Sequence, residues 1–161
     1  MIPEKIKPYF DVTLLKMDFA NKLIEGGLAC CGEHAFDVLT VGEVKHGMFF
    51  DTCLFPEKDT IILKAICKKC GKVILVFDSR CDGYGHLKEK QHAPIAAKPF
   101  RCKKCSDDSF SVSIKYEYPT AKELKELGIS ETDNAFTWIW VTLGCNKCGA
   151  GYKNFIDLET E

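Results

Sequence analysis

The chain lacks a charge imbalance, a long apolar segment and a hydrophobic leader. Its 22 Lys and Arg residues balance 23 Asp and Glu residues to a formal net charge of −1, which argues against binding of a polyanion by the whole molecule. The longest purely apolar run is Val73–Phe77, far short of the roughly 20 residues that a membrane-spanning helix needs. Residues 1–10 contain no apolar core of a secretory signal. We therefore expect a protein of the reducing cytoplasm, with no membrane partner.

Cysteine, in contrast, is abundant. The 161 residues include ten cysteines, with 46% apolar and 28% charged residues, a composition typical of a folded chain with one ordinary domain or two small ones. Because cytosolic thiols stay reduced, closely spaced cysteines in such a protein usually indicate a metal site and not a disulfide framework. The sequence therefore predicts a metalloprotein.

Two Cys-x-x-Cys pairs mark the ends of residues 100–149. Cys102 and Cys105 open this stretch, and Cys145 and Cys148 close it. Cysteines at this spacing can bind one ion from a tight turn, and two such turns supply the four thiolates of a tetrahedral zinc site, with metal–sulfur distances of about 2.3 Å. Four protein ligands leave no position for water, so we expect a closed structural site. Iron bound as in rubredoxin is the alternative to zinc.

A second set of candidate ligands lies nearer the N-terminus. Cys67 and Cys70 form a complete pair, and Cys31 is the third candidate. Two residues compete for the fourth position: Cys30, which is adjacent to Cys31, and His34, which restores the Cys-x-x-Cys type of spacing. The sequence leaves both open. The cysteines that remain as outside candidates are Cys53 and Cys81.

The two halves of the chain can be laid over one another. With an offset of 74 residues, Cys31, Phe36 and Val38 match Cys105, Phe110 and Val112. With an offset of 78 residues, Ile61, Cys67, Lys69, Cys70, Gly71 and Phe77 match Ile139, Cys145, Lys147, Cys148, Gly149 and Phe155. Under the first offset, however, Leu28 stands where the second half has Cys102. We interpret the match as an internal duplication and expect two zinc ions per chain.

Each half resembles a zinc ribbon: a cysteine turn, a pair of strands, a second cysteine turn followed by Gly, and a closing strand. The resemblance covers Phe100–Leu158 well and Leu28–Asp78 less well. It implies a small antiparallel β unit around a tetrahedral zinc ion. It implies no particular role, because zinc ribbons act as adaptors in transcription, RNA handling and enzyme assembly alike.

The side-chain pattern predicts a mainly β fold with short helices, a small α+β protein of two duplicated zinc-ribbon-like antiparallel units. Apolar and polar residues alternate most clearly over Phe110–Tyr118, as in a half-buried strand. Two short helices are expected, one over Asp18–Glu25 with Asp18 as its cap, and one that begins at the capping box Thr120–Glu123. Further expected strands are Thr60–Ile66, Val73–Phe77, Phe136–Leu143 and Tyr152–Leu158.

Glycine and proline divide the chain into three segments. Residues 1–78 are an N-terminal bracing segment with the first, degenerate ribbon unit, residues 79–99 are a basic linker, and residues 100–161 are the second ribbon unit. Trp138 and Trp140, with Phe136, form an aromatic stripe that could stack on bases, although packing in a core is the commoner role. The basic residues in and beside the linker that could contact nucleic acid or a protein partner are Lys88, Lys90, Lys98 and Arg101.

These features favour a non-enzymatic zinc-binding protein that serves as a binding or adaptor module for nucleic acid or a protein partner. The lysines within the cysteine turns are interpreted as compensation for thiolate charge. The alternative is a thiol-based redox protein or cysteine-dependent enzyme. It would use Cys81, which has His86 nearby in the sequence, or a labile first metal site. The sequence specifies neither a partner nor an oligomeric state.

Overall fold

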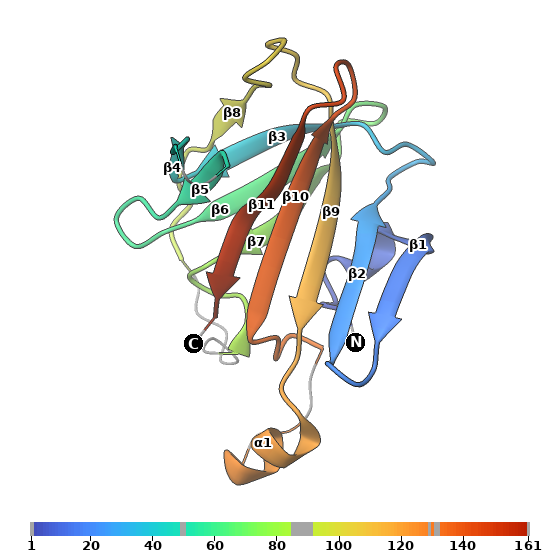
Figure 1. Ribbon diagram of the computed structural model, residues 1–161, viewed down its shortest axis with the longest axis vertical. Coiled ribbons are helices and arrows are strands. Elements are labelled where there is room, and N and C mark those ends of the chain that lie inside the picture. Colours follow the sequence, from blue (N-terminus) through green and yellow to red (C-terminus); the bar gives the residue numbers. More distant parts are fainter. Residues whose placement is uncertain (1, 49–50, 85–91, 129, 131–132, 161) are drawn as a thin grey trace.

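The computed structural model describes residues 2–48, 51–84, 92–128, 130 and 133–160. The protein is mainly antiparallel β, as the sequence predicts (Figure 1). Short helical segments are η1 (Lys7–Tyr9) and α1 (Ala121–Glu126). The strands are β1 (Phe10–Asp18), β2 (Leu23–Leu28), β3 (Phe36–Val41), β4 (Glu43–Lys45), β5 (Cys53–Phe55), β6 (Ile62–Cys67), β7 (Val73–Asp78), β8 (Lys98–Phe100), β9 (Phe110–Glu117), β10 (Trp138–Cys145) and β11 (Gly151–Glu159).

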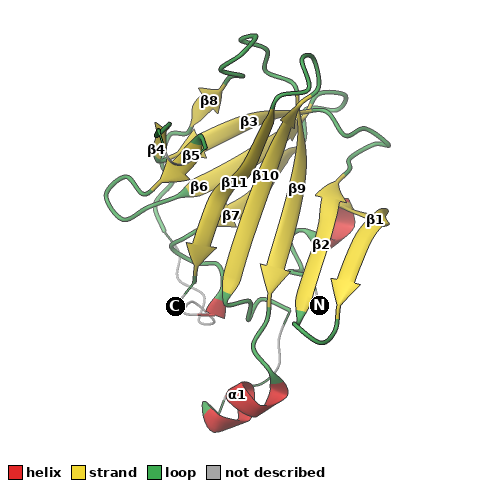
Figure 2. Ribbon diagram, in the orientation of Figure 1, coloured by secondary structure: helices red, strands yellow, loops and turns green. Residues whose placement is uncertain are grey.

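One curled nine-stranded sheet makes up most of the molecule, and β4 and β5 form a separate hairpin. Strands β1, β2, β9, β10 and β11 form one side of the sheet, and β8, β3, β6 and β7 cross behind them (Figure 2). The two sides are joined where β3 meets β9, at the pair Phe36↔Phe110. Phe36 and Phe110 are fully buried, so the junction lies in the hydrophobic core.

The alternation of side chains places the core between the two sides. Along β9, Phe110, Val112, Ile114 and Tyr116 are buried while the residues between them are partly exposed, as the alternating pattern predicts. Strand β10 shows the same alternation. The capping box of α1 is also confirmed, because the Thr120 side chain accepts a hydrogen bond from the Glu123 amide and the Glu123 carboxylate accepts one from the Thr120 amide.

The expected helix over Asp18–Glu25 is wrong. Asp18 ends β1, and its carboxylate accepts hydrogen bonds from the amides of Ala20 and Asn21, so that it stabilises a turn and not a helix. The chain then enters β2, in which Ile24 pairs with Tyr116 of β9. This non-local pairing outweighs the weak local helix preference of a short segment.

The strands that precede the cysteine turns are exchanged between the two parts of the chain. Strand β2, from the N-terminal part, pairs with β9 of the C-terminal part, and β8, from the C-terminal part, pairs with β3 of the N-terminal part. Both pairings have the same register: Gly27↔Ser113 and Gly26↔Ile114 correspond to Pro99↔Leu39 and Lys98↔Thr40. Each side of the sheet therefore contains strands from both parts.

The hairpins repeat in the same way. The β3–β6 pairs Phe36↔Cys67 and Val38↔Ala65 correspond to the β9–β10 pairs Phe110↔Cys145 and Val112↔Leu143, at the offsets of 74 and 78 residues seen in the sequence. The amide of Lys68 donates to the carbonyl of Ala35, and the amide of Asn146 donates to the carbonyl of Ser109, at the same two offsets. The pattern of pairing thus occurs twice in one chain.

The division of the sequence into residues 1–78, 79–99 and 100–161 stays a prediction. Lys98 and Pro99, assigned to the linker, lie in β8 and pair with β3. Arg80, near the start of the linker, binds the carboxylate of Asp78 and the carbonyl of Ala93. Within the described part of the chain, no helix combines the length and apolar character needed to cross a bilayer.

A prediction follows from the close packing of β2 on β1. A Cβ atom at Gly26 would overlap the ring of Phe10, whereas one at Gly151, in β11, would meet nothing within 4 Å. We expect Gly26→Ala to lower the free energy of unfolding by about 1–3 kcal/mol, because the ring must move in a packed core. The matched Gly151→Ala variant should change it little. Urea denaturation of both variants measures the difference, and equal effects would contradict this packing.

Candidate metal centres

Eight of the ten cysteines converge in two groups, in each of which the four sulfur atoms lie within 4.8 Å of one another. The first group is Cys30, Cys31, Cys67 and Cys70, and the second is Cys102, Cys105, Cys145 and Cys148. The sulfur–sulfur distances include 3.9 Å for Cys30–Cys31, 3.7 Å for Cys30–Cys70, and 3.6 Å for both Cys102–Cys148 and Cys105–Cys145.

These distances fit a shared metal ion. Bonds of about 2.3 Å from a tetrahedral ion to four sulfurs place the sulfurs about 3.8 Å apart. A disulfide would instead hold its two sulfurs about 2.05 Å apart, and all ten cysteines are free. Each group is therefore compatible with one tetrahedrally bound metal ion.

Three of the four cysteine turns share one backbone structure. In each, the amide that follows the second cysteine donates to the carbonyl of the first, at 2.8 Å for Gly71 to Cys67, 2.8 Å for Ser106 to Cys102 and 2.9 Å for Gly149 to Cys145. The donor residue has a positive φ in all three turns, between 61° and 74°. Glycine adopts this conformation at little cost, which explains why Gly71 and Gly149 follow their pairs.

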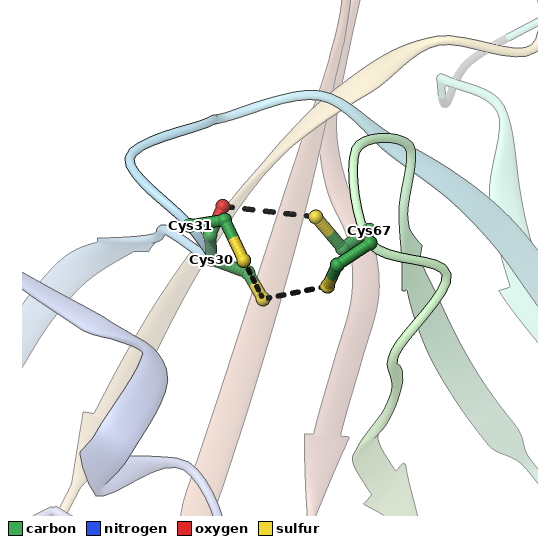
Figure 3. Close-up of side chains that lie close together, drawn as sticks. Cys30, Cys31 and Cys67 are labelled. Atoms are coloured by element: carbon green, nitrogen blue, oxygen red, sulfur yellow. Dashed lines mark hydrogen bonds between the residues drawn. The ribbon is translucent and has the colours of Figure 1, made fainter.

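The fourth turn, Cys30–Glu33, is two residues shorter. Cys30 and Glu33 exchange two backbone hydrogen bonds of 3.0 and 2.9 Å, and the residues between them, Cys31 and Gly32, have φ values of 55° and 75°. These are the features of a primed two-residue hairpin turn. The turn brings the side chains of Cys30 and Cys31 together beside Cys67 (Figure 3). The thiol of Cys67 donates a hydrogen bond to the carbonyl of Cys30 at 3.6 Å.

His34 lies outside both sulfur groups. Its Nε2 atom is 2.6 Å from Oδ2 of Asp11, so it links the first cysteine turn to β1. The structure thus brings Cys30, and not His34, to the other three sulfurs. The shorter turn also explains why Leu28 stood opposite Cys102 in the sequence comparison. Among the described residues, Cys53 and Cys81 are also outside both groups.

Tyr152 contacts the second sulfur group, a contact that sequence analysis missed. The amide of Lys103 donates to its hydroxyl oxygen at 2.8 Å, and this oxygen lies 3.2 Å from Sγ of Cys102. Since the oxygen accepts from Lys103, its own proton is available for the sulfur. The Tyr152 ring packs edge-on against Phe100, at a centroid distance of 5.2 Å. A tyrosine in an alternating strand looks like any core residue, so only its closeness to Cys148 in the sequence hinted at this role.

The environment favours thiolate at particular cysteines. Burial acts to raise the pKa of Cys102, but hydrogen bonds from the Tyr152 hydroxyl and from the Cys105 and Lys104 amides bring it down to about 6. A hydrogen bond from the Lys72 amide is the main cause that lowers the pKa of Cys70 to about 7. Metal ligation requires deprotonated sulfur, which these contacts favour at Cys102 and Cys70, whereas burial and the neighbouring cysteines raise the pKa of Cys30 to about 12.

The two groups differ in exposure. Cys30 and Cys67 of the first group are buried, but Cys31 and Cys70 are exposed. In the second group, Cys102 and Cys145 are also buried, but Cys105 and Cys148 are half-buried and not exposed.

Lysines of the cysteine turns pair with carboxylates. Nζ of Lys68 lies 2.6 Å from Oδ1 of both Asp37 and Asp108, so that it joins the two parts of the chain and lowers the pKa of Asp108. Looser pairs are Lys69–Glu33 at 3.7 Å and Lys147–Asp107 at 3.8 Å.

The described residues that were predicted to contact a partner come from different elements. Lys88 and Lys90 lie outside the described residues, and the guanidinium of Arg101 donates to the Ser106 carbonyl at 3.4 Å. Trp138 and Trp140 stack on the partly exposed outer face of β10, with ring centroids 5.6 Å apart. Phe136 is buried in the core, so it does not extend this stripe.

The two tryptophan rings already have close contacts. Nε1 of Trp138 donates to Oδ1 of Asp157 at 2.7 Å, and Nζ of Lys115 lies 4.5 Å from the centroid of the Trp140 ring.

Cys81 is a half-buried thiol beside the carbonyl of Asp78, at 3.8 Å. Burial, followed by the carboxylates of Asp82 and Asp78, raises its pKa to about 11. The thiol is therefore protonated at neutral pH, where it is a poor nucleophile. His86 lies outside the described residues.

Comparisons of the chain with models of known protein families, with curated proteins and with solved structures find no match.

The geometry of the first group predicts which residues are needed for metal binding. With metal supplied during expression, Cys30→Ser should lower the metal content by about one ion per chain, because one of four sulfurs is lost. His34→Ala should leave the metal content unchanged, since its imidazole contacts Asp11. Elemental analysis of the purified variants tests this, and loss of metal in the histidine variant alone would show that the ligand set is wrong.

Proposed function

We propose that the protein is a non-enzymatic, cytoplasmic zinc protein that serves as a binding or adaptor module. In this proposal, two structural Zn(Cys)4 sites stabilise its duplicated sheet. The observation that carries the proposal is the convergence of four sulfurs in each group at tetrahedral spacing. Such a set of four thiolates suits zinc, and it leaves no open position for a substrate or water.

The repeated register supports the internal duplication. The pairs of β3 with β6 and of β9 with β10 correspond residue by residue, and so do the exchanged pairings of β2 and β8. A loss of two residues in the first cysteine turn accounts for the one irregular position, since Cys30 then corresponds to Cys102. Each copy in this account supplies a complete set of four sulfurs, as a zinc-ribbon-like unit would.

The role of binding module rests on the closed character of the sites. A metal ion without an open coordination position contributes shape and stability, not chemistry. The candidate contacts for a nucleic acid or protein partner are Lys98 of β8 and Arg101 after it, and, on a separate strand, the partly exposed Trp138 and Trp140 of β10.

The direct experiment is the metal content of protein expressed without added metal. We expect two zinc ions per chain and no iron. Replacement of zinc by cobalt should give intense sulfur-to-cobalt charge-transfer absorption with the d–d bands of a tetrahedral site. A Cys53→Ser, Cys81→Ser variant, which keeps both sulfur groups, should be indistinguishable. A metal-free protein that retains the fold would refute the proposal.

Removal of the second site, which contains Cys145 and Cys148, should affect the whole sheet. Structural zinc contributes about 10–16 kcal/mol to small domains at neutral pH, and strands of both parts of the chain pair with one another. We therefore expect Cys145→Ser with Cys148→Ser to disorder both parts, as seen by loss of dispersed amide resonances in two-dimensional NMR. Resonances that survive from residues 10–78 alone would show that the parts fold independently.

A further inference from the structure

We infer that the first sulfur group, Cys30, Cys31, Cys67 and Cys70, is the site at which the protein exchanges metal with the surrounding solution, while the second group retains its ion. The inference rests on the proposed function, because it requires an ion at both groups. The partner is an acceptor with nitrogen or sulfur donors, such as a small chelating ligand or the empty thiolate site of another protein.

The first support is access. An incoming donor must reach the ion past the sulfurs, and two of the four cysteines in the first group, Cys31 and Cys70, are exposed. In the second group the most accessible cysteines, Cys105 and Cys148, are only half-buried. The first group therefore has two exposed thiolates at which displacement could begin.

The second support is the set of contacts behind the sulfurs. The Tyr152 hydroxyl lies 3.2 Å from Sγ of Cys102 and accepts a hydrogen bond from the Lys103 amide. At the offset of 78 residues that relates β10–β11 to β6–β7, Tyr152 corresponds to Ile74, a buried aliphatic residue that has no hydroxyl to donate. Outer contacts of this kind hold a ligand in place, and their loss costs metal affinity.

The third support is the shortened turn. Cys102 and Cys105 are separated by Lys103 and Lys104, and the Lys103 amide donates to the Tyr152 hydroxyl beside the Cys102 sulfur. Cys30 and Cys31 are adjacent, so the first group has no residues that correspond to these two lysines.

The exchange step is a ligand substitution without oxidation or reduction. A donor atom of the acceptor forms a bond to the ion while the bond from the ion to the sulfur of Cys31 or Cys70 breaks. The released thiolate takes a proton from solvent, and repetition at the remaining sulfurs transfers the ion.

The test uses the full chain loaded with two zinc ions and a chromophoric zinc chelator in excess. We expect two phases of release, each of one zinc ion per chain. Samples taken between the phases and treated with a maleimide should be modified at Cys31 and Cys70 and not at Cys102 or Cys145, as read by mass spectrometry of peptides.

A variant pair separates this inference from a general loss of stability. Tyr152→Phe keeps the ring but removes the hydroxyl, and it should speed the slow phase about tenfold while leaving the fast phase unchanged. Tyr116→Phe is the matched control, because the buried Tyr116 hydroxyl has no hydrogen-bond partner among the described residues. It should change neither phase.

The outcomes are distinct. Release of both ions in one phase, or first release from the second group, would overturn the inference and leave the proposed function standing. Fewer than two zinc ions before the chelator is added would overturn the proposed function itself.

Discussion

In each of the two sulfur groups, four sulfur atoms lie within 4.8 Å of one another. The rest of the structure depends on this constraint. Thiolates at this spacing repel strongly unless a cation lies between them. Each sulfur sits in a turn at the end of a strand, so whatever holds the sulfurs together also fixes where β2, β3, β6, β9 and β10 begin or end. The hydrophobic core then fills the space between strands whose ends are already placed.

Sequence reasoning works where the determinants are local. The spacing of Cys102, Cys105, Cys145 and Cys148 is sufficient to predict their convergence, and alternation is sufficient to predict β9. Sequence reasoning does not identify the strand that pairs with β2, because the pairing of Ile24 with Tyr116 joins residues far apart in the sequence. It also leaves Cys30 and His34 undecided, because the answer depends on the φ values of Cys31 and Gly32, which a residue pattern does not specify.

The exchanged strands make the two parts of the chain interdependent. Strand β2 of the N-terminal part pairs with β9, and β8 of the C-terminal part pairs with β3. Lys68 reinforces this arrangement through its contacts with Asp37 and Asp108, although an exposed ion pair contributes only about 0–1 kcal/mol. The buried core is one cluster that contains residues of both parts.

This crossing has a consequence for biosynthesis. When the ribosome has made residues 1–78, β2 is paired only with β1 and β3 only with β6, because β9 and β8 are still to be translated. The N-terminal part therefore leaves the exit tunnel with open strand edges, and such non-local pairing delays folding until the distant segment arrives. The nascent chain can aggregate through these open edges during this interval. A chaperone that covers the edges would therefore protect the chain most during its synthesis.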